Sequence, residues 1–227
     1  MAAKMQRSGD VAILYDDALL DHADTALFMP PTGAVNAVGG RGSAWILDRG
    51  GEQWVLRHYR RGGFAAKLSA DLYLWTGLEG TRAWREWRLL DSLYKEDLPV
   101  PQPVAVRVTR HGLFYRADLI TRRIGEARSL AERLQGDARR IPWGAIGACI
   151  RRFHDAGVCH ADLNAHNLLL DEEAKVYLID FDRGARRRSG DWKQENLARL
   201  RRSLDRLLGR ASDAGDWAAL LEGYRAA

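Results

Sequence analysis

Cysteine is scarce in this chain of 227 residues, which carries only Cys149 and Cys159. The two lie ten residues apart and form no C-x-x-C pair, so the sequence offers neither a disulfide framework nor a zinc knuckle. No stretch approaches the roughly 18 consecutive apolar residues of a membrane-spanning helix. The first thirty residues lack the basic start and apolar run of a signal peptide. We therefore expect reduced, buried cysteines and a cytoplasmic protein with at most peripheral membrane contact.

Lysine is the second shortage, because only five of the 35 basic residues are lysine and the rest are arginine. The formal net charge is +5 at pH 7. The planar guanidinium group suits phosphate and carboxylate, so this bias favours an anionic partner such as a nucleotide, a nucleic acid or an acidic membrane surface. Solvated arginine-rich faces would give the same composition. Charge alone leaves both interpretations open.

Short apolar runs separated by glycine dominate the first half of the chain and predict strands. Residues 48–51, whose composition favours a tight turn, join two of these runs into an antiparallel hairpin. Two further runs flank a turn at residues 110–112 and complete a predicted five-stranded sheet. The expected strands are residues 11–15, 44–47, 53–57, 104–108 and 113–121.

Helical periodicity follows, with an early helix from about Thr81 and the others after Ser129. Strands first and helices afterwards indicate an α+β fold, and the length fits one compact unit with two lobes. In the third expected helix, arginines lie mostly opposite the apolar stripe. The four expected stripes are Trp84, Trp87, Leu90 and Leu93 or Tyr94; Trp143, Ile146, Ile150 and Phe153; Leu197, Leu200, Leu204 and Leu207; and Trp217, Leu220 and Tyr224.

The densest group of polar residues lies at residues 160–167, which read HADLNAHN. Asp162 stands five residues ahead of Asn167, and Asp180 follows thirteen residues later, after a strand-like pair. A loop followed by a hairpin can bring these three side chains together at the mouth of a cleft. Their oxygens suit Mg²⁺, and one carboxylate can still accept a proton from a hydroxyl group.

Two other interpretations of these residues stay open. Taken singly, Asp162 and Asn167 could simply cap turns. Alternatively, a metal cluster could form from several side chains, although zinc sites usually show tighter paired spacing. The members of that cluster would be His154, His160, Asp162 and His166. The complete set at its spacing favours phosphoryl transfer.

The loop and the segment at Asp180 resemble the protein-kinase-like superfamily, whose catalytic loop reads H-R-D-x-x-x-x-N and whose metal-binding motif begins D-F-G. By this resemblance Asp162 is the catalytic base, Asn167 and Asp180 are Mg²⁺ ligands, and His160 is structural. The implied cofactors are ATP and Mg²⁺. The implied fold has an antiparallel five-stranded N-lobe and a reduced, mostly helical C-lobe. Asp182 replaces the glycine of D-F-G, so we expect a constitutively assembled site.

Nucleotide binding is expected from the first half of the chain. The glycine-rich residues 38–43 could let backbone N–H groups approach phosphates, although a plain hairpin turn would also explain them. Arg57 stands where the superfamily has a phosphate-contacting lysine, and Lys67 comes ten residues late. Arg57 could instead be a surface residue of a strand. The cofactor-binding residues implied by the resemblance are Gly40, Gly42, Ser43, Arg57 and its expected acidic partner Glu86.

Further segments narrow the resemblance to the 3-deoxy-D-manno-octulosonic acid (Kdo) kinase family of Gram-negative bacteria, over about residues 35 to 210. They are residues 40–43, 57–63, 98–103, 160–167, 179–182 and 190–196. This resemblance implies ATP-dependent phosphorylation of the 4-hydroxyl of Kdo on a lipid A precursor during lipopolysaccharide synthesis. Arg60, Arg61 and residues 186–188 could attract this anionic glycolipid, or could be solvated or bind nucleotide phosphate.

The resemblance also implies a peripheral protein at the cytoplasmic face of the inner membrane. We expect a monomer without a nucleic-acid partner, with an N-lobe of residues 1–121 and a C-lobe of residues 122–227. Rival functions are another small-molecule kinase or an atypical protein kinase of the same fold, and a nucleotide-binding pseudokinase or RNA-binding module without chemistry.

Overall fold

A computed structural model describes residues 3–29, 44–60, 71–136, 141–188, 190–209 and 214–227. The chain divides into two compact units, Met1–Asp91 with Gln102–Arg123, and Ser92–Pro101 with Ile124–Ala227. The lobes expected at residues 1–121 and 122–227 stay a prediction. The units differ from those lobes because Ser92–Pro101 belongs to the second unit.

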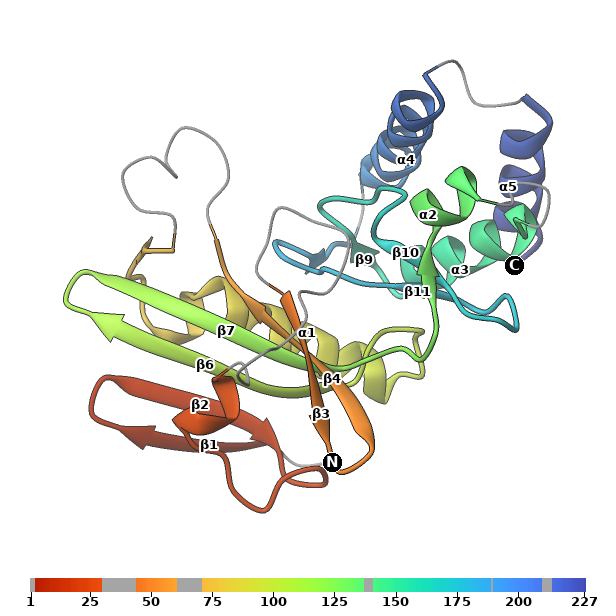
Figure 1. Cartoon of the computed structure of the whole chain (residues 1–227). Helices are drawn as coiled ribbons and strands as arrows, with labels where there is room; N and C mark the ends of the chain where they lie inside the picture. The colour runs from red at the N-terminus through yellow and green to blue at the C-terminus, as the bar shows by residue number, and fades with distance from the viewer. Residues whose placement is uncertain (1–2, 30–43, 61–70, 137–140, 189, 210–213) are drawn as a thin grey trace. The chain divides into compact units, whose positions relative to one another are not determined.

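An antiparallel sheet of seven strands forms the first unit (Figure 1). Its order is β1-β2-β6-β7-β4-β3, and β5 pairs with β7. The strands are β1 (Ala3–Ser8), β2 (Val11–Asp16), β3 (Ala44–Arg49), β4 (Glu52–His58), β5 (Tyr73–Leu74), β6 (Pro103–His111) and β7 (Phe114–Arg122). Two short 3₁₀ helices accompany them, η1 (Thr25–Phe28) and η3 (Leu78–Gly80).

The prediction of a five-stranded sheet was wrong, because β1 and β5 add to the five expected strands. β1 pairs along its whole length with β2, but most of its side chains are exposed. It therefore carries no apolar alternation that a sequence pattern could reveal. β5 has two residues, too few for any period. Both strands are set by pairing with a neighbour rather than by their own composition.

The predicted hairpin of β3 and β4 is confirmed, with Arg49 opposite Glu52. Gly50 and Gly51 form its two-residue loop with φ of +64° and +87°. Glycine adopts these values without steric cost, and a loop of this kind matches the right-handed twist of the strands. The register places Arg57 of β4 opposite Leu119 of β7.

Helix α1 (Arg82–Lys95) has the predicted apolar stripe, with Trp84, Trp87, Leu90 and Leu93 all buried. The N–H of Arg82 donates to the hydroxyl of Tyr115 in β7 at 3.1 Å, which holds the start of the helix beside the sheet. A core cluster of the same unit combines residues of η1 and of several strands. It includes Ile13, Phe28, Leu47, Trp54, Leu56 and Ile120.

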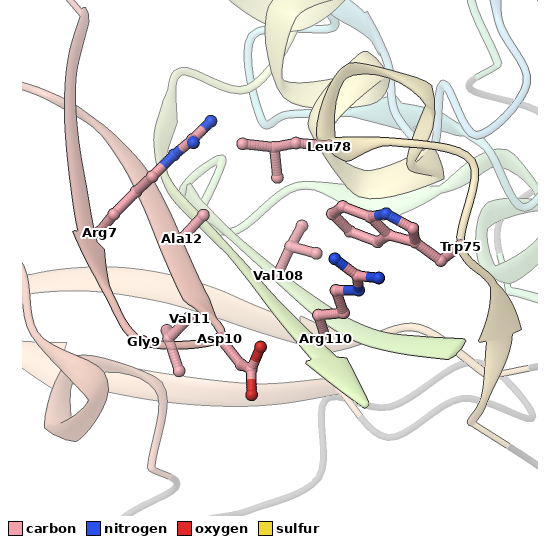
Figure 2. A pocket seen from close by; sticks show the side chains of 9 residues that line it. All are labelled: Arg7, Gly9, Asp10, Val11, Ala12, Trp75, Leu78, Val108 and Arg110. Carbon is pink, nitrogen blue, oxygen red and sulfur yellow. The ribbon is translucent and has the colours of Figure 1, made fainter. Parts of the chain in front are cut away.

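A hollow of about 340 Å³ lies beside β1, β2 and β6 (Figure 2). Arg7 stands on one side and Trp75 with Arg110 on the other, with Ala12 and Val108 between them. The guanidinium carbon of Arg110 lies 5.2 Å from the centre of the Trp75 ring. The hollow thus has an apolar floor and a charged rim, in which Asp10 accompanies the two arginines.

Helices dominate the second unit, as predicted, and three small strand pairings accompany them (Figure 1). β10 pairs with β11 and β8, and β9 pairs with β12. The helices are α2 (Leu130–Gln135), α3 (Trp143–Asp155), α4 (Trp192–Leu208) and α5 (Ala214–Ala226). The strands are β8 (Arg128–Ser129), β9 (Val158–Cys159), β10 (Leu168–Leu170), β11 (Val176–Leu178) and β12 (Ala185–Arg186).

Helices α3 and α5 approach each other closely, because two glycines lie at their contact. A Cβ atom on Gly147 would meet the carbonyl oxygen of Leu220 at 1.9 Å, and one on Gly223 would meet that of Gly144 at 2.1 Å. The predicted stripe of α3 is buried throughout. Among the described helices, none is both long and apolar enough to cross a membrane.

Candidate active site

The loop from His160 to Asn167 follows β9 and leads into β10, so short strands fix both its ends. Its middle is held at the main chain of Ala165. The carbonyl of Ala165 accepts from the N–H of Ala131 in α2 at 3.0 Å, and its N–H donates to Oγ of Ser203 in α4 at 3.3 Å. Two helices and two strand pairs of the second unit thus brace the loop.

His160 anchors the start of this loop and is buried. Its Nε2 donates to the carbonyl of Ile179 at 2.9 Å, and its Nδ1 accepts from the N–H of Asp162 at 3.2 Å. One donor and one acceptor define a neutral imidazole. Burial lowers the pKa of His160, against the opposing effects of the Ile179 carbonyl and the carboxylates of Asp180 and Asp162. These contacts give His160 a structural role.

Asp162 presents its carboxylate to solvent, with 61% of the side chain exposed. Its Oδ2 accepts from Nδ2 of Asn164 at 3.1 Å, and its Oδ1 lies 3.4 Å from Nη1 of Arg199. Asn164 also donates to the carbonyl of Asp162 at 3.1 Å, which ties the carboxylate to its own main chain. An exposed and oriented carboxylate can accept a proton from a hydroxyl group.

Asn167 closes the loop and is buried. Its Nδ2 donates to the carbonyl of Asp162 at 2.9 Å. Because the amide nitrogen is engaged in this way, the amide oxygen is the atom left to serve as a metal ligand. The main-chain carbonyl of Asn167 accepts from the N–H of Ile179 at 3.1 Å, which joins the loop to the segment that carries Asp180.

Asp180 lies in the left-handed region with φ of +63°, which few side chains other than Asn and Asp tolerate. The next residue, Phe181, is buried, and its ring centre lies 4.8 Å from that of His160 and 5.7 Å from that of Phe153. Asp180 therefore lies between Ile179, which is hydrogen-bonded to the loop, and Phe181, whose ring packs on His160 of the loop. The structure brings the segments of Asp162, Asn167 and Asp180 together.

Helix α4 meets the loop with one face. Oδ1 of Asn196 accepts from the N–H of His160 at 3.2 Å, and one turn later Arg199 reaches Asp162. The third contact of this face is the hydroxyl of Ser203, described above. Its three residues step by three and four, as a single helical face requires.

Two residues beside the candidate base were missed by the sequence interpretation. It assigned Arg199 only to a basic outer face of its helix, and Asn164 to no role. The available signal for Arg199 was that the polar residues Asn196, Arg199 and Ser203 recur at three- and four-residue intervals in an amphipathic helix. Asn164 had only the turn preference of asparagine as a signal.

In the first unit, Arg57 and Glu86 form an ion pair with Nη2 and Oε2 at 2.5 Å. The Glu86 side chain is only 1% exposed. The hydroxyl of Tyr59 donates to the same carboxylate and accepts from Nη2 of Arg57 at 3.0 Å. A buried carboxylate and a phenol therefore fix the guanidinium of Arg57.

Several predicted residues fall elsewhere. Gly40, Gly42 and Ser43 lie outside the described residues, as do Arg61 and Lys67. Arg186 pairs with Glu96, and its Nη1 donates to the carbonyl of Ala156 at 2.9 Å, so it braces the second unit. Arg60, Arg187 and Arg188, the other members of the predicted arginine clusters within the described chain, are exposed, as is Arg186 itself.

The metal-cluster interpretation finds no support. In the described part of the chain, no group of three or more His, Cys, Asp and Glu residues could hold a metal ion. His154 instead bonds the Tyr224 hydroxyl at 2.8 Å, and burial lowers its pKa to about 4. Cys149 and Cys159 are free and buried, as predicted, and burial raises the pKa of Cys149 to about 12.

Two solved structures share this fold. WaaP in complex with acyl carrier protein superposes with a TM-score of 0.56 at 17% identity, over 86% of this chain and 78% of that one. The Rio2 kinase-ADP/Mg²⁺-phosphoaspartate complex from Chaetomium thermophilum superposes with a TM-score of 0.51 at 18% identity, over 82% of this chain and 59% of that one. The fold is therefore kinase-like.

Sequence comparison gives the particular family. The model of the lipopolysaccharide kinase (Kdo/WaaP) family matches residues 30–224. The 3-deoxy-D-manno-octulosonic acid kinase of Xanthomonas axonopodis pv. citri is 46% identical, over 100% of this chain and 94% of that protein. The 3-deoxy-D-manno-octulosonic acid kinase of Stenotrophomonas maltophilia (strain K279a) is 48% identical, over 88% of this chain and 83% of that protein. The chain belongs to the lipopolysaccharide kinase (Kdo/WaaP) family, and the resemblance drawn from its motifs is confirmed.

Proposed function

We propose that this chain transfers the γ-phosphoryl group of ATP to the 4-hydroxyl of Kdo on a lipid A precursor, in synthesis of the lipopolysaccharide inner core. Family membership and the names of its relatives support the acceptor. The observation that carries the reaction type is the exposed carboxylate of Asp162, held in a loop that is hydrogen-bonded to the Asp180 segment.

Asp162 acts as the general base of this reaction. It orients the sugar hydroxyl and takes its proton as the oxygen forms a bond to the γ-phosphorus, while the bond to ADP breaks. Such proton transfer contributes about 10²–10⁴-fold to a rate, and holding the reactants in line contributes the rest. Asn164 keeps the carboxylate in place through its bond to Oδ2.

Asn167 and Asp180 would hold Mg²⁺. An amide oxygen and a carboxylate fit this hard cation, which takes its remaining ligands from phosphate oxygens and water. Asn167 fits because its amide nitrogen already donates to a main-chain carbonyl. When bound, the ion neutralises charge on the β- and γ-phosphates.

Nucleotide phosphates are held by residues of the first unit in this proposal. Arg57 contacts them in place of the usual lysine, and Glu86 keeps its guanidinium in position. A guanidinium group can bind phosphate through two parallel hydrogen bonds. The proposal also assigns phosphate contacts to Gly40, Gly42 and Ser43, which lie outside the described residues.

The protein would act as a monomer at the cytoplasmic face of the inner membrane, without a nucleic-acid partner. Support for membrane contact comes from one end of the sheet, here called the sheet tip and formed by Leu74, Leu113 and Phe114. These residues are 59%, 72% and 43% exposed. Leu74 pairs with Phe114 across β5 and β7, and the N–H of Trp75 bonds the carbonyl of Leu113 at 2.8 Å. Exposed apolar groups gathered in this way suit a lipid surface.

A transfer assay with radiolabelled Mg-ATP and detergent-dispersed Kdo-lipid A precursor tests the proposal. The wild-type protein should add one phosphate at the 4-hydroxyl, and Asp162→Asn should lose about 10²–10⁴-fold in kcat. His166→Ala, an exposed residue of the same loop, is the matched control and should stay near wild type. Labelling of a protein or an aminocyclitol instead would indicate another kinase, and no transfer to any acceptor would indicate a pseudokinase.

A further inference from the structure

The ion pair of Arg199 with Asp162 contributes little to stability. The two side chains are 46% and 61% exposed, and pairs between groups this exposed are strongly screened by water. The neighbouring contacts of the same helix face, at Asn196 and Ser203, are buried and neutral. They already fasten α4 to the loop, so a charged residue at position 199 needs another explanation.

The proposed acceptor supplies one, because Kdo is itself an acid. At neutral pH its carboxyl group is negatively charged, and one of its hydroxyl groups has to reach the carboxylate of Asp162. Two negative charges brought this close repel each other. A cation that touches both would remove the repulsion and would also fix the orientation of the sugar.

We infer that Arg199 binds the carboxylate of the sugar acid and so selects acidic over neutral acceptors; this inference rests on the proposed function. Guanidinium carries five N–H donors in a planar fork that matches a carboxylate. Nη1 faces Asp162, and nearly half of the side chain is open to solvent. The neighbouring Arg201 is directed elsewhere, with its guanidinium carbon 5.5 Å from the centre of the Trp217 ring.

A cycle of two proteins and two acceptors tests this role. The acceptors are detergent-dispersed Kdo-lipid A precursor and the same compound with its carboxyl group converted to the carboxamide. Wild type should prefer the acid by roughly 100-fold in kcat/KM, because the neutral analogue offers the guanidinium no negative charge. Arg199→Gln should lose about that factor on the acid and show no preference, and Arg199→Lys should be intermediate.

The inference would be overturned if the effect of the substitution and the effect of the acceptor were independent of each other. If Arg199→Gln slows both acceptors equally and keeps the preference for the acid, Arg199 acts on Asp162 or the nucleotide instead. Equal rates of wild type on the two acceptors would overturn it without any variant, so poor folding of a variant does not decide the matter. No transfer by wild type to the acid would instead overturn the proposed function. Arg202→Gln, an exposed arginine of the same helix, should behave as wild type.

Discussion

Glu86 of α1, almost fully buried, holds the guanidinium of Arg57 at 2.5 Å. Resemblance to the superfamily predicts a lysine at position 57. Glu86, the acidic partner expected for that lysine, is present and pairs with Arg57 instead. This pair has the phosphate-contacting role in the proposal, with arginine as the cation in place of lysine. Its energetics follow from the burial of one partner and the partial exposure of the other.

Arg57→Ala should destabilise the protein by about 3 kcal/mol, because a buried carboxylate loses its charged partner. It should also raise the KM for ATP more than it lowers kcat. Urea unfolding and steady-state kinetics measure the two effects. Arg60→Ala removes an exposed arginine three residues away and should leave stability within about 0.5 kcal/mol of wild type. Equal effects of the two variants would contradict the role of the pair.

Asp180→Asn should abolish the Mg²⁺-dependent part of nucleotide binding while the fold persists. Asparagine tolerates the left-handed backbone, so the substitution removes charge without adding strain. Asp180→Ala should cost roughly 1 kcal/mol more in stability, because alanine disfavours this conformation. Calorimetric titration with ADP, with and without Mg²⁺, gives the first result and thermal unfolding the second. Undiminished Mg²⁺ enhancement in Asp180→Asn would rule out the ligand role.

Stability should fall as the pH drops below about 6.5, because His154 is buried as a neutral ring. Its pKa is about 4 in the folded protein against 6.5 for the free side chain. Its contribution is therefore complete above pH 6.5 and is lost on acidification towards pH 4, where the unfolded chain binds a proton that the folded one does not. The loss should reach up to about 3 kcal/mol. Urea unfolding from pH 7 to pH 4.5 measures it, and His154→Gln should show a shallower dependence.

Gly147→Ala and Gly223→Ala should each destabilise the protein by about 2–4 kcal/mol. Each new methyl group would overlap a main-chain carbonyl of the facing helix, and backbone cannot move aside as a flexible side chain does. Gly144→Ala is the matched control, because its Cβ would lie 3.9 Å from the carbonyl oxygen of Ala219, an ordinary van der Waals contact. Thermal unfolding should separate the control from both other variants, and similar losses in all three would count against close helix packing.

The double variant Leu113→Asp, Phe114→Asp should weaken binding to vesicles that contain acidic phospholipid by at least tenfold, since each substitution replaces an apolar contact by a charge. Met29→Asp alters another exposed apolar residue, 65% exposed and outside the sheet tip, and should bind as wild type does. Co-sedimentation measures binding. Unchanged binding of the double variant would leave the sheet tip without a membrane role.

The sequence predicted the core elements because burial is periodic. The stripe of α1 was readable because every third or fourth residue had to be apolar, and the hairpin of β3 and β4 because two short apolar runs flank the turn residues 48–51. β1 was not readable, because its side chains stay in water and its place is fixed by hydrogen bonds to β2. Whether an edge strand forms depends on the strand with which it pairs, and the local composition of the edge strand does not show that partner.

The candidate site divides in the same way. The spacing of Asp162, Asn167 and Asp180 is local, so the loop and the hairpin after it could be expected together. Arg199 reaches Asp162 across 37 residues of sequence. No local pattern encodes a contact over that distance, and an arginine among other arginines carries no individual signal.

The face of α4 that meets the loop has one more consequence, which concerns insertions and deletions. Asn196 and Ser203 are joined by a helix of fixed pitch, in which each residue adds about 1.5 Å of rise and about 100° of rotation. One residue gained or lost between them would therefore turn Ser203 away from Ala165 while Asn196 stayed on His160. The length of this helical segment is thus fixed by two contacts that it has to make at once, with His160 at one end and Ala165 at the other.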